Sequence, residues 1–133
     1  MSAERATYLD SSAIVKLAVL EPESSALRRY LRRKQPLVTS ALARTEVARA
    51  LLPFGTAALA RGDDALSRLD IVRVNDRILR EAGTMLPPEL RSLDAIHLAS
   101  AAALGADLAR VCTYDERMAV AATGLGMKVV APN

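Results

Sequence analysis

Four acidic residues, Asp10, Glu46, Asp94 and Asp115, are the candidates for chemistry in this sequence. Asp94 lies in RSLDAIHLASAAALG (residues 91–105), a pattern that predicts a helix with apolar residues on nearly every side. Such a helix is normally buried in a core. A buried carboxylate is costly unless it is paired, hydrogen-bonded or bound to a metal. The chemistry to examine first is therefore that of an acidic site.

Three of these acids also have a purely structural explanation. Asp10, or a serine beside it, can cap the helix that follows. Asp94 lies in the first turn of its helix, where it can interact favourably with the helix dipole. Thr113 and Glu116 match the two ends of a capping box around Asp115. For Asp115 taken alone, the structural explanation is the stronger one.

Glu46 is harder to explain in this way, because it lies in the middle of the predicted helix ALARTEVARALL. It shares a face with Leu42 and Ala50, its neighbours at i−4 and i+4. Capping and the helix dipole do not place an acid there. A buried ion pair with Arg44 or Arg49 is the remaining structural alternative.

Four carboxylates gathered in one place would repel one another unless a cation neutralised them. Oxygen ligands suit hard divalent ions such as Mg²⁺ and Mn²⁺. The chain has one His and one Cys, which argues against a zinc site of the usual kind and against a serine or cysteine triad. The chemistry that remains is metal-activated water attacking a phosphate.

The elements that position these acids alternate along the chain. The patterns predict strands at 6–10, 36–40, 70–74, 110–114 and 127–132. They predict helices at 11–20, 21–34, 41–54, 56–69, 76–86, 91–105 and 115–126, with serine caps on the first and third and a break at Gly62. This alternation indicates an α/β fold with a mostly parallel central sheet. In such sheets a ligand binds beyond the carboxyl ends of the strands, the edge at which Asp10, Asp94 and Asp115 are expected.

Composition narrows the class of protein. The 133 residues are expected to form one domain, residues 1–133, and 51% hydrophobic with 25% charged residues is ordinary for a soluble chain. No apolar run is long enough to span a membrane and no secretory signal is visible. The lone Cys112 excludes an internal disulfide, and we expect a cytoplasmic protein. The net charge of +3 leaves a nucleic-acid partner open.

The segments around the acids resemble the motifs of the PIN-domain family of metal-dependent nucleases, and in particular its VapC-type toxins of bacterial toxin–antitoxin pairs. In order along the chain they are LDSSAIVKL with Asp10, TSALARTEVARAL with Glu46, LRSLDAIHLASAAALG with Asp94, and VCTYDERMAVAATGLGMKVVAP with Asp115. The third segment is the most specific. The resemblance covers essentially the whole chain and no motif is missing.

This resemblance implies a three-layer α/β/α sandwich and an endoribonuclease that uses Mg²⁺ or Mn²⁺. It further implies a homodimer, and an antitoxin whose tail enters the acidic groove. Ser11 and Thr113 match positions that support the acids in the family, although either could be a plain helix cap. The catalytic and metal-binding residues that it implies are Asp10 and Asp94, as the most direct ligands, with Glu46 and Asp115.

Other residues near the motifs carry weaker expectations. Arg91, three residues before Asp94, is our candidate for a contact with the substrate phosphate. His97, one turn after Asp94, is interpreted as a satisfied core or interface histidine, with a hydrogen bond to an acid as the alternative. The basic residues of the second helix form a solvated face by default and an RNA or partner contact otherwise. They are Arg28, Arg29, Arg32, Arg33 and Lys34.

Three other functions remain as alternatives. The chain could be a PIN-like nuclease that processes RNA or cleaves DNA outside any toxin pair. It could be a phosphoacceptor that uses Asp10, although a haloacid-dehalogenase site needs a second Asp where this chain has Ser12, and a receiver domain needs adjacent acids after its first strand. A non-catalytic binding module would leave Glu46 unexplained.

Overall fold

The central sheet is parallel throughout. In the computed structural model, which describes residues 5–133, five strands lie in the order β3-β2-β1-β4-β5 and every neighbouring pair is parallel. The predicted parallel sheet is therefore confirmed. The strands are β1 (Ala6–Leu9), β2 (Leu37–Ser40), β3 (Asp70–Val72), β4 (Leu108–Cys112) and β5 (Val129–Val130).

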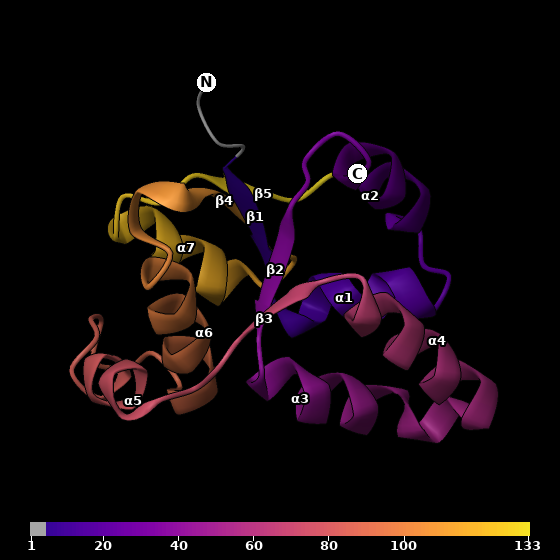
Figure 1. Ribbon diagram of the computed structural model, residues 1–133, viewed down its shortest axis with the longest axis horizontal. Helices are drawn as coiled ribbons and strands as arrows, with labels where there is room; N and C mark the ends of the chain where they lie inside the picture. The colour runs from indigo at the N-terminus through magenta and orange to yellow at the C-terminus, as the bar shows by residue number, and fades with distance from the viewer. Residues whose placement is uncertain (1–4) are drawn as a thin grey trace.

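Helices cover both faces of this sheet, which confirms the three-layer α/β/α sandwich (Figure 1). One face carries α1 (Ser11–Ala18), α2 (Ser24–Leu31), α3 (Leu42–Leu51) and α4 (Thr56–Ser67). The other carries α5 (Asp76–Gly83), α6 (Ser92–Ala102) and α7 (Glu116–Gly124). Short 3-10 turns follow α3 at Leu52–Phe54 and α6 at Gly105–Asp107.

The core forms on both faces because side chains alternate along each strand. On β1, Leu9 faces the α1–α4 side and joins Ile14 and Val47 in one hydrophobic cluster. Its neighbour Tyr8 faces the opposite way and packs with Ala101 of α6. Since Asp10 lies two residues beyond Tyr8, the end of the central strand emerges from the most buried part of the molecule.

The predicted helix break at Gly62 is wrong, because α4 runs through it without interruption. Gly62 is buried where α4 crosses α3. A Cβ atom there would lie 2.5 Å from Cδ1 of Leu51 and 3.2 Å from Cγ1 of Val47. The glycine therefore marks a close approach of two helices.

The predicted caps are corrected in part. Asp10 itself, and not a serine, caps α1 by accepting a hydrogen bond from the Ala13 amide. The capping box around Asp115 is also wrong, because Asp115 is the N-cap residue of α7. The predicted Ser40 cap is wrong as well, because the N-cap residue of α3 is Ala41. The Ser40 hydroxyl nevertheless accepts a hydrogen bond from the Leu42 amide at the start of α3.

Several predicted helices are shorter in the structure. The first ends at Ala18 rather than at residue 20, and the fifth ends at Gly83. The second occupies only 24–31 of the predicted 21–34, because the Ser24 hydroxyl accepts from the Glu21 amide and forms a turn there. Within the described residues no helix is long and apolar enough to cross a membrane. The single domain over residues 1–133 stays a prediction.

Candidate active site

The four acids come from four elements around the carboxyl ends of the strands. Asp10 directly follows β1, and Asp115 caps α7 shortly after β4. Asp94 lies in the first turn of α6 and Glu46 in the middle of α3. A hydroxyl group and a guanidinium connect Asp10, Asp115 and Asp94, whereas Glu46 is held separately by a serine and a histidine.

Asp10 is the most buried of the acids, with 3% of its surface exposed. Its Oδ1 accepts hydrogen bonds from the Ser12 hydroxyl at 2.6 Å and from the Ala13 amide at 3.1 Å. Its Oδ2 accepts from the Thr113 hydroxyl at 2.5 Å. Burial raises the pKa of Asp10 above its ordinary value, although these three hydrogen bonds favour the carboxylate.

Thr113 connects Asp10 to the fourth acid. While its hydroxyl donates to Asp10, the same Oγ1 accepts from the backbone amide of Asp115 at 3.1 Å. Ser12 makes a parallel link, because its Oγ accepts from the Tyr114 amide at 3.0 Å. The ends of β1 and β4 are thus fastened together by two hydroxyl groups at the candidate site.

Arg91 connects the third acid to the fourth. Its Nε donates to Oδ2 of Asp94 at 3.1 Å, and its Nη2 donates to Oδ2 of Asp115 at 3.2 Å. The Arg91 side chain is 59% exposed. A single exposed positive charge therefore lies between two of the candidate metal ligands.

Glu46 receives two hydrogen bonds on one oxygen. Its Oε1 accepts from the Ser11 hydroxyl at 2.6 Å and lies 2.5 Å from Nε2 of His97. Partial burial raises the pKa of Glu46, but the hydrogen bonds from His97 and Ser11 have the larger combined effect in the opposite direction. The pKa of Glu46 therefore lies below its ordinary value.

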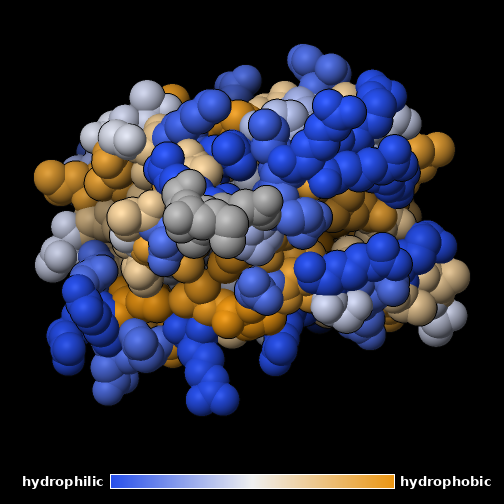
Figure 2. Space-filling view, turned by 45° about the horizontal axis from the view of Figure 1, so that its top comes forward, coloured by the Kyte–Doolittle hydropathy of each residue, from blue (hydrophilic) through white to orange (hydrophobic). Residues whose placement is uncertain are grey.

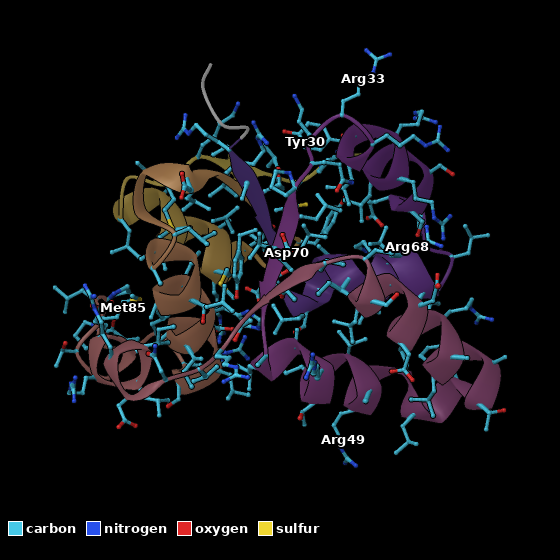
Figure 3. The ribbon with its side chains drawn as sticks, in the orientation of Figure 1. Tyr30, Arg33, Arg49, Arg68, Asp70 and Met85 are labelled. Carbon is cyan, nitrogen blue, oxygen red and sulfur yellow. The ribbon has the colours of Figure 1, made fainter. Side chains whose placement is uncertain are left out.

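The predicted structural alternative for Glu46, an ion pair with a neighbouring arginine, is wrong. Among residues 5–133 neither Arg44 nor Arg49 forms a salt bridge with it. Figure 3 shows Arg49 pointing away from the body of the molecule below α3. The mid-helix acid is instead held by a serine and a histidine from other elements.

His97 is both buried and bonded to an acid, so the two interpretations of this residue hold together. It exposes 1% of its surface, and its Nδ1 lies 2.7 Å from the Tyr8 hydroxyl. The two rings meet edge to face with their centroids 5.9 Å apart. Sequence reasoning overlooked Tyr8. The available signal was its polar hydroxyl within the apolar stretch ATYL, on the same strand face as Asp10.

The donor chemistry fits a hard divalent cation, since all four acids offer oxygen ligands. The four acids are not close enough together to form a complete metal site. Within residues 5–133, no three His, Cys, Asp or Glu side chains form a cluster that could hold an ion. Ser11 and Thr113 each donate to one acid, which is the supporting position expected for them.

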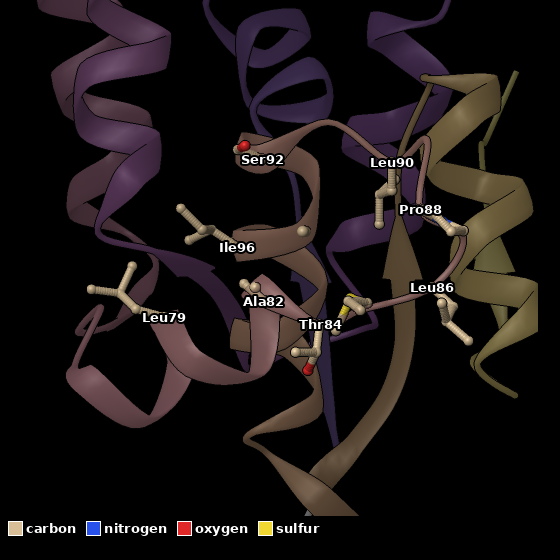
Figure 4. Close-up of a pocket in the computed structure, with 11 residues that line it drawn as sticks. Leu79, Ala82, Thr84, Leu86, Pro88, Leu90, Ser92 and Ile96 are labelled. Carbon is tan, nitrogen blue, oxygen red and sulfur yellow. The ribbon is translucent and has the colours of Figure 1, made fainter.

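One hollow in the described surface lies away from the acids. It measures about 460 Å³, lies between α5 and α6, and is lined by residues that include Leu79, Ala82 and Ile96 (Figure 4). A pocket of about 360 Å³ contains Asp94 and Arg91. Of the four acids, Asp94 is the one in the lining of this pocket.

The basic residues of α2 lie apart from these contacts. Arg28, Arg29, Arg32 and Arg33 are exposed, and Figure 3 shows Arg33 pointing outward beside α2. Hydrophilic side chains gather at the upper right of Figure 2, above a band of hydrophobic ones. Arg28 also donates to the Leu17 carbonyl at the end of α1. Exposure fits the default interpretation of a solvated face, and a contact with RNA stays a prediction.

Comparison with known proteins supports these assignments of fold and motif. Residues 7–124 match the family model described as PIN domain. The chain is 64% identical over 128 residues to a protein named ribonuclease VapC46 of Mycobacterium tuberculosis (strain ATCC 25618 / H37Rv), covering 96% of this chain and 98% of that protein. It is 42% identical over 130 residues to ribonuclease VapC35 of Mycobacterium tuberculosis (strain CDC 1551 / Oshkosh), with coverage of 94% and 96%.

Solved structures show the same fold at low sequence identity. The crystal structure of Mycobacterium tuberculosis VapC20, described as a sarcin–ricin loop cleaving toxin, superposes with a TM-score of 0.74 at 18% identity, covering 95% of this chain and 99% of that chain. A toxin–antitoxin complex from Klebsiella pneumoniae gives a TM-score of 0.71 at 22% identity, with coverage of 96% and 98%.

Proposed function

Because this chain belongs to the PIN domain family, we propose that it is an endoribonuclease that acts as the toxin of a toxin–antitoxin pair. The observation that carries the proposal is the 64% identity, over 96% of the chain, to a protein named as a ribonuclease. The acids at the carboxyl edge of the sheet supply the chemistry that hydrolysis of a phosphodiester bond requires.

The proposed catalytic residues are the four acids, Asp10, Glu46, Asp94 and Asp115. Ser11 and Thr113 support them, because each hydroxyl donates to one carboxylate. Arg91 is exposed and already lies among the acids, which supports its proposed contact with a phosphate of the RNA. A guanidinium suits this task because its planar fork matches phosphate geometry.

The proposed cofactor is Mg²⁺ or Mn²⁺, held by Asp10 and Asp94 most directly and by Asp115 and Glu46 beside them. Such an ion supplies an activated water and stabilises the charge that develops on the phosphate. The position of Arg91 between Asp94 and Asp115 supports this assignment, because these carboxylates already bind a positive group.

The proposed partners are an RNA substrate, a cognate antitoxin and a second copy of the chain. Exposed apolar side chains on α5, on α6 and on the loop between them support a protein interface. They include Leu79, Leu86 and Leu93, and two of them line the groove of Figure 4. We also propose a cytoplasmic location, in keeping with the single buried thiol of Cys112.

The phosphoacceptor alternative fits these contacts poorly. A phosphoacceptor carboxylate must be reached by the phosphate donor, whereas Asp10 is 3% exposed and both of its oxygens already accept hydrogen bonds. A PIN-like nuclease outside a toxin pair would use the same acids. The two nuclease functions are distinguished by experiment.

The decisive test incubates the purified protein with total cellular RNA in Mg²⁺ or Mn²⁺ and maps the new 5′ ends. We expect discrete cleavage that stops in EDTA and returns when the ion is restored. Undiminished cleavage in EDTA would contradict the metal proposal. Growth arrest on expression, relieved by a small neighbouring gene, would support the toxin assignment, and growth without arrest would favour the other nuclease function.

A further inference from the structure

The carboxylate of Glu46 is held asymmetrically. Both of its hydrogen bonds, from Ser11 and from His97, reach Oε1. Within residues 5–133 no hydrogen bond reaches Oε2. Asp10 differs, because each of its two oxygens has a hydroxyl donor. The contacts of Glu46 therefore distinguish a fixed oxygen from a free one.

Each nitrogen of the His97 ring has one partner. A carboxylate only accepts hydrogen bonds, so Nε2 of His97 carries the proton that points at Glu46. The other nitrogen, Nδ1, lies 2.7 Å from the Tyr8 hydroxyl and forms the second hydrogen bond of the ring.

The environment of the imidazole keeps this direction fixed. Tyr8 has no exposed surface and lies on β1, the central strand, paired on both sides with Val38 and Val111. His97 is 1% exposed and lies on α6, whose neighbouring residues Leu98 and Ala99 are fully buried. A ring held edge to face against Tyr8 in this packing cannot turn without breaking both hydrogen bonds.

We propose that His97 is a positioning residue for Glu46. Tyr8 anchors the imidazole at Nδ1, and the proton on Nε2, together with the Ser11 hydroxyl, fixes Oε1 of Glu46. Oε2 is thereby held in one orientation, free to bind the proposed cation or the attacking water. The inference rests on the proposed function, because it takes Glu46 to be catalytic.

Two amide variants test the two ring nitrogens of His97 one at a time. In His97→Gln the amide nitrogen takes the place of Nε2 and still donates to Glu46. In His97→Asn the shorter amide takes the place of Nδ1, so it keeps the contact with Tyr8 and loses Glu46. Under single-turnover conditions we expect His97→Asn to lower the maximal rate by about tenfold to a hundredfold, the cost of a misplaced group, with unchanged half-saturation by RNA. His97→Gln should stay within about threefold of wild type, because it keeps that donor.

The double variant His97→Asn/Glu46→Gln shows whether His97 acts through Glu46. If it does, the double variant cleaves no more slowly than Glu46→Gln alone, because effects of residues that act as a unit do not add. A further loss equal to that of His97→Asn would overturn the inference, as would wild-type cleavage by His97→Asn. Wild-type cleavage by Glu46→Gln would instead contradict the proposed active site itself.

A spectroscopic measurement tests the inference without relying on activity. His97 is the only histidine of the chain, so nitrogen-15 labelling of histidine gives one pair of imidazole signals. We expect the wild-type spectrum of a ring with a proton on Nε2. Tyr8→Phe, which removes only the hydroxyl bonded to Nδ1, should change the Nδ1 signal. A ring protonated at Nδ1 alone, or an Nδ1 signal unchanged in Tyr8→Phe, would overturn the inference even if His97→Asn fails to fold.

Discussion

The candidate site has two halves that hold their acids in opposite ways. The inner cluster, Tyr8, Ser11, His97 and Glu46, is a network of hydrogen bonds in which Ser11 and His97 contact the carboxylate and Tyr8 contacts His97. Tyr8 and His97 are completely or almost completely buried. The outer cluster, Arg91, Asp94 and Asp115, is held by charge on an arginine that is 59% exposed. Hydrogen bonds in a buried network are strong and specific, whereas exposed ion pairs contribute little and exchange easily. The buried half therefore holds its carboxylate more rigidly than the exposed half holds its two carboxylates.

The strongest test of the outer cluster is Asp94→Asn. We expect cleavage to fall by about a thousandfold or more, because the loss of a metal ligand removes several kcal/mol of charge stabilisation. The melting temperature without metal should be unchanged or higher, since repulsion among the acids is relieved. Single-turnover cleavage and thermal melts on one preparation measure both.

Asp64→Asn is the matched control for this change. It breaks an exposed pair, 3.2 Å apart, with Arg68 just after α4, and should leave both measurements unchanged. A clearly lower melting temperature in Asp94→Asn, with the control unaffected, would show that Asp94 is a structural anchor. The outer cluster would then resemble the inner one.

In the inner cluster the largest effect is expected from Glu46→Gln. Cleavage should fall by about a hundredfold or more, in the range of a positioned acid or base. Stability should be spared, because the Gln amide oxygen still accepts from His97 and Ser11. Glu81→Gln, which breaks the exposed pair with Arg77 on α5, is the control. A variant that melts early yet cleaves at the wild-type rate when cold would make Glu46 structural.

Arg91→Ala should change metal binding more than stability. Removing the positive charge beside Asp94 and Asp115 should tighten Mn²⁺ binding about threefold to tenfold, as expected for unit charges a few ångströms apart in solvent. Calorimetric titration of Mn²⁺ measures this, with Arg68→Ala as the control. Cleavage should nevertheless fall if Arg91 contacts the RNA. Unchanged Mn²⁺ affinity would mean that the outer cluster does not exchange Arg91 for a metal ion.

The smallest effect is expected from Ser11→Ala, which removes one of the two donors to Glu46. Cleavage should fall about fivefold, the factor that corresponds to one ordinary hydrogen bond. Ser25→Ala, at an exposed position of α2, is the control. A loss as large as that of Glu46→Gln would mean that the hydroxyl itself takes part in the reaction, and the inner cluster would be more than a support.

The sheet, the layers and the positions of the four acids could be predicted because they depend on local patterns. Strand and helix periods are visible within a few residues, and Asp10 follows its strand directly. The side-chain contacts of the acids could not, because Thr113 lies 103 residues from Asp10 in the sequence and His97 lies 51 from Glu46. Only the tertiary fold decides which polar groups meet across such separations.

The errors at helix ends have a similar cause. Gly62 was expected to break a helix because glycine has a low helix propensity, but its missing side chain is what lets α4 approach Leu51. Asp10 and Asp115 proved to be helix caps as well as candidate site residues. At these two positions the structural and functional explanations were treated as alternatives in the sequence, but they are compatible.

The hydrogen bond between Thr113 and Asp10 spans 103 residues of the chain. The central strand β1 pairs with β2 on one edge and with β4, a much later segment, on the other. On a translating ribosome, a growing polypeptide has no means of assembling the acids until nearly all of it has left the exit tunnel, because such long-range contacts form only once both partners are present. If the four acids are catalytic, as proposed, a nascent chain, or one truncated before Thr113, has no complete site with which to cleave the RNA around it.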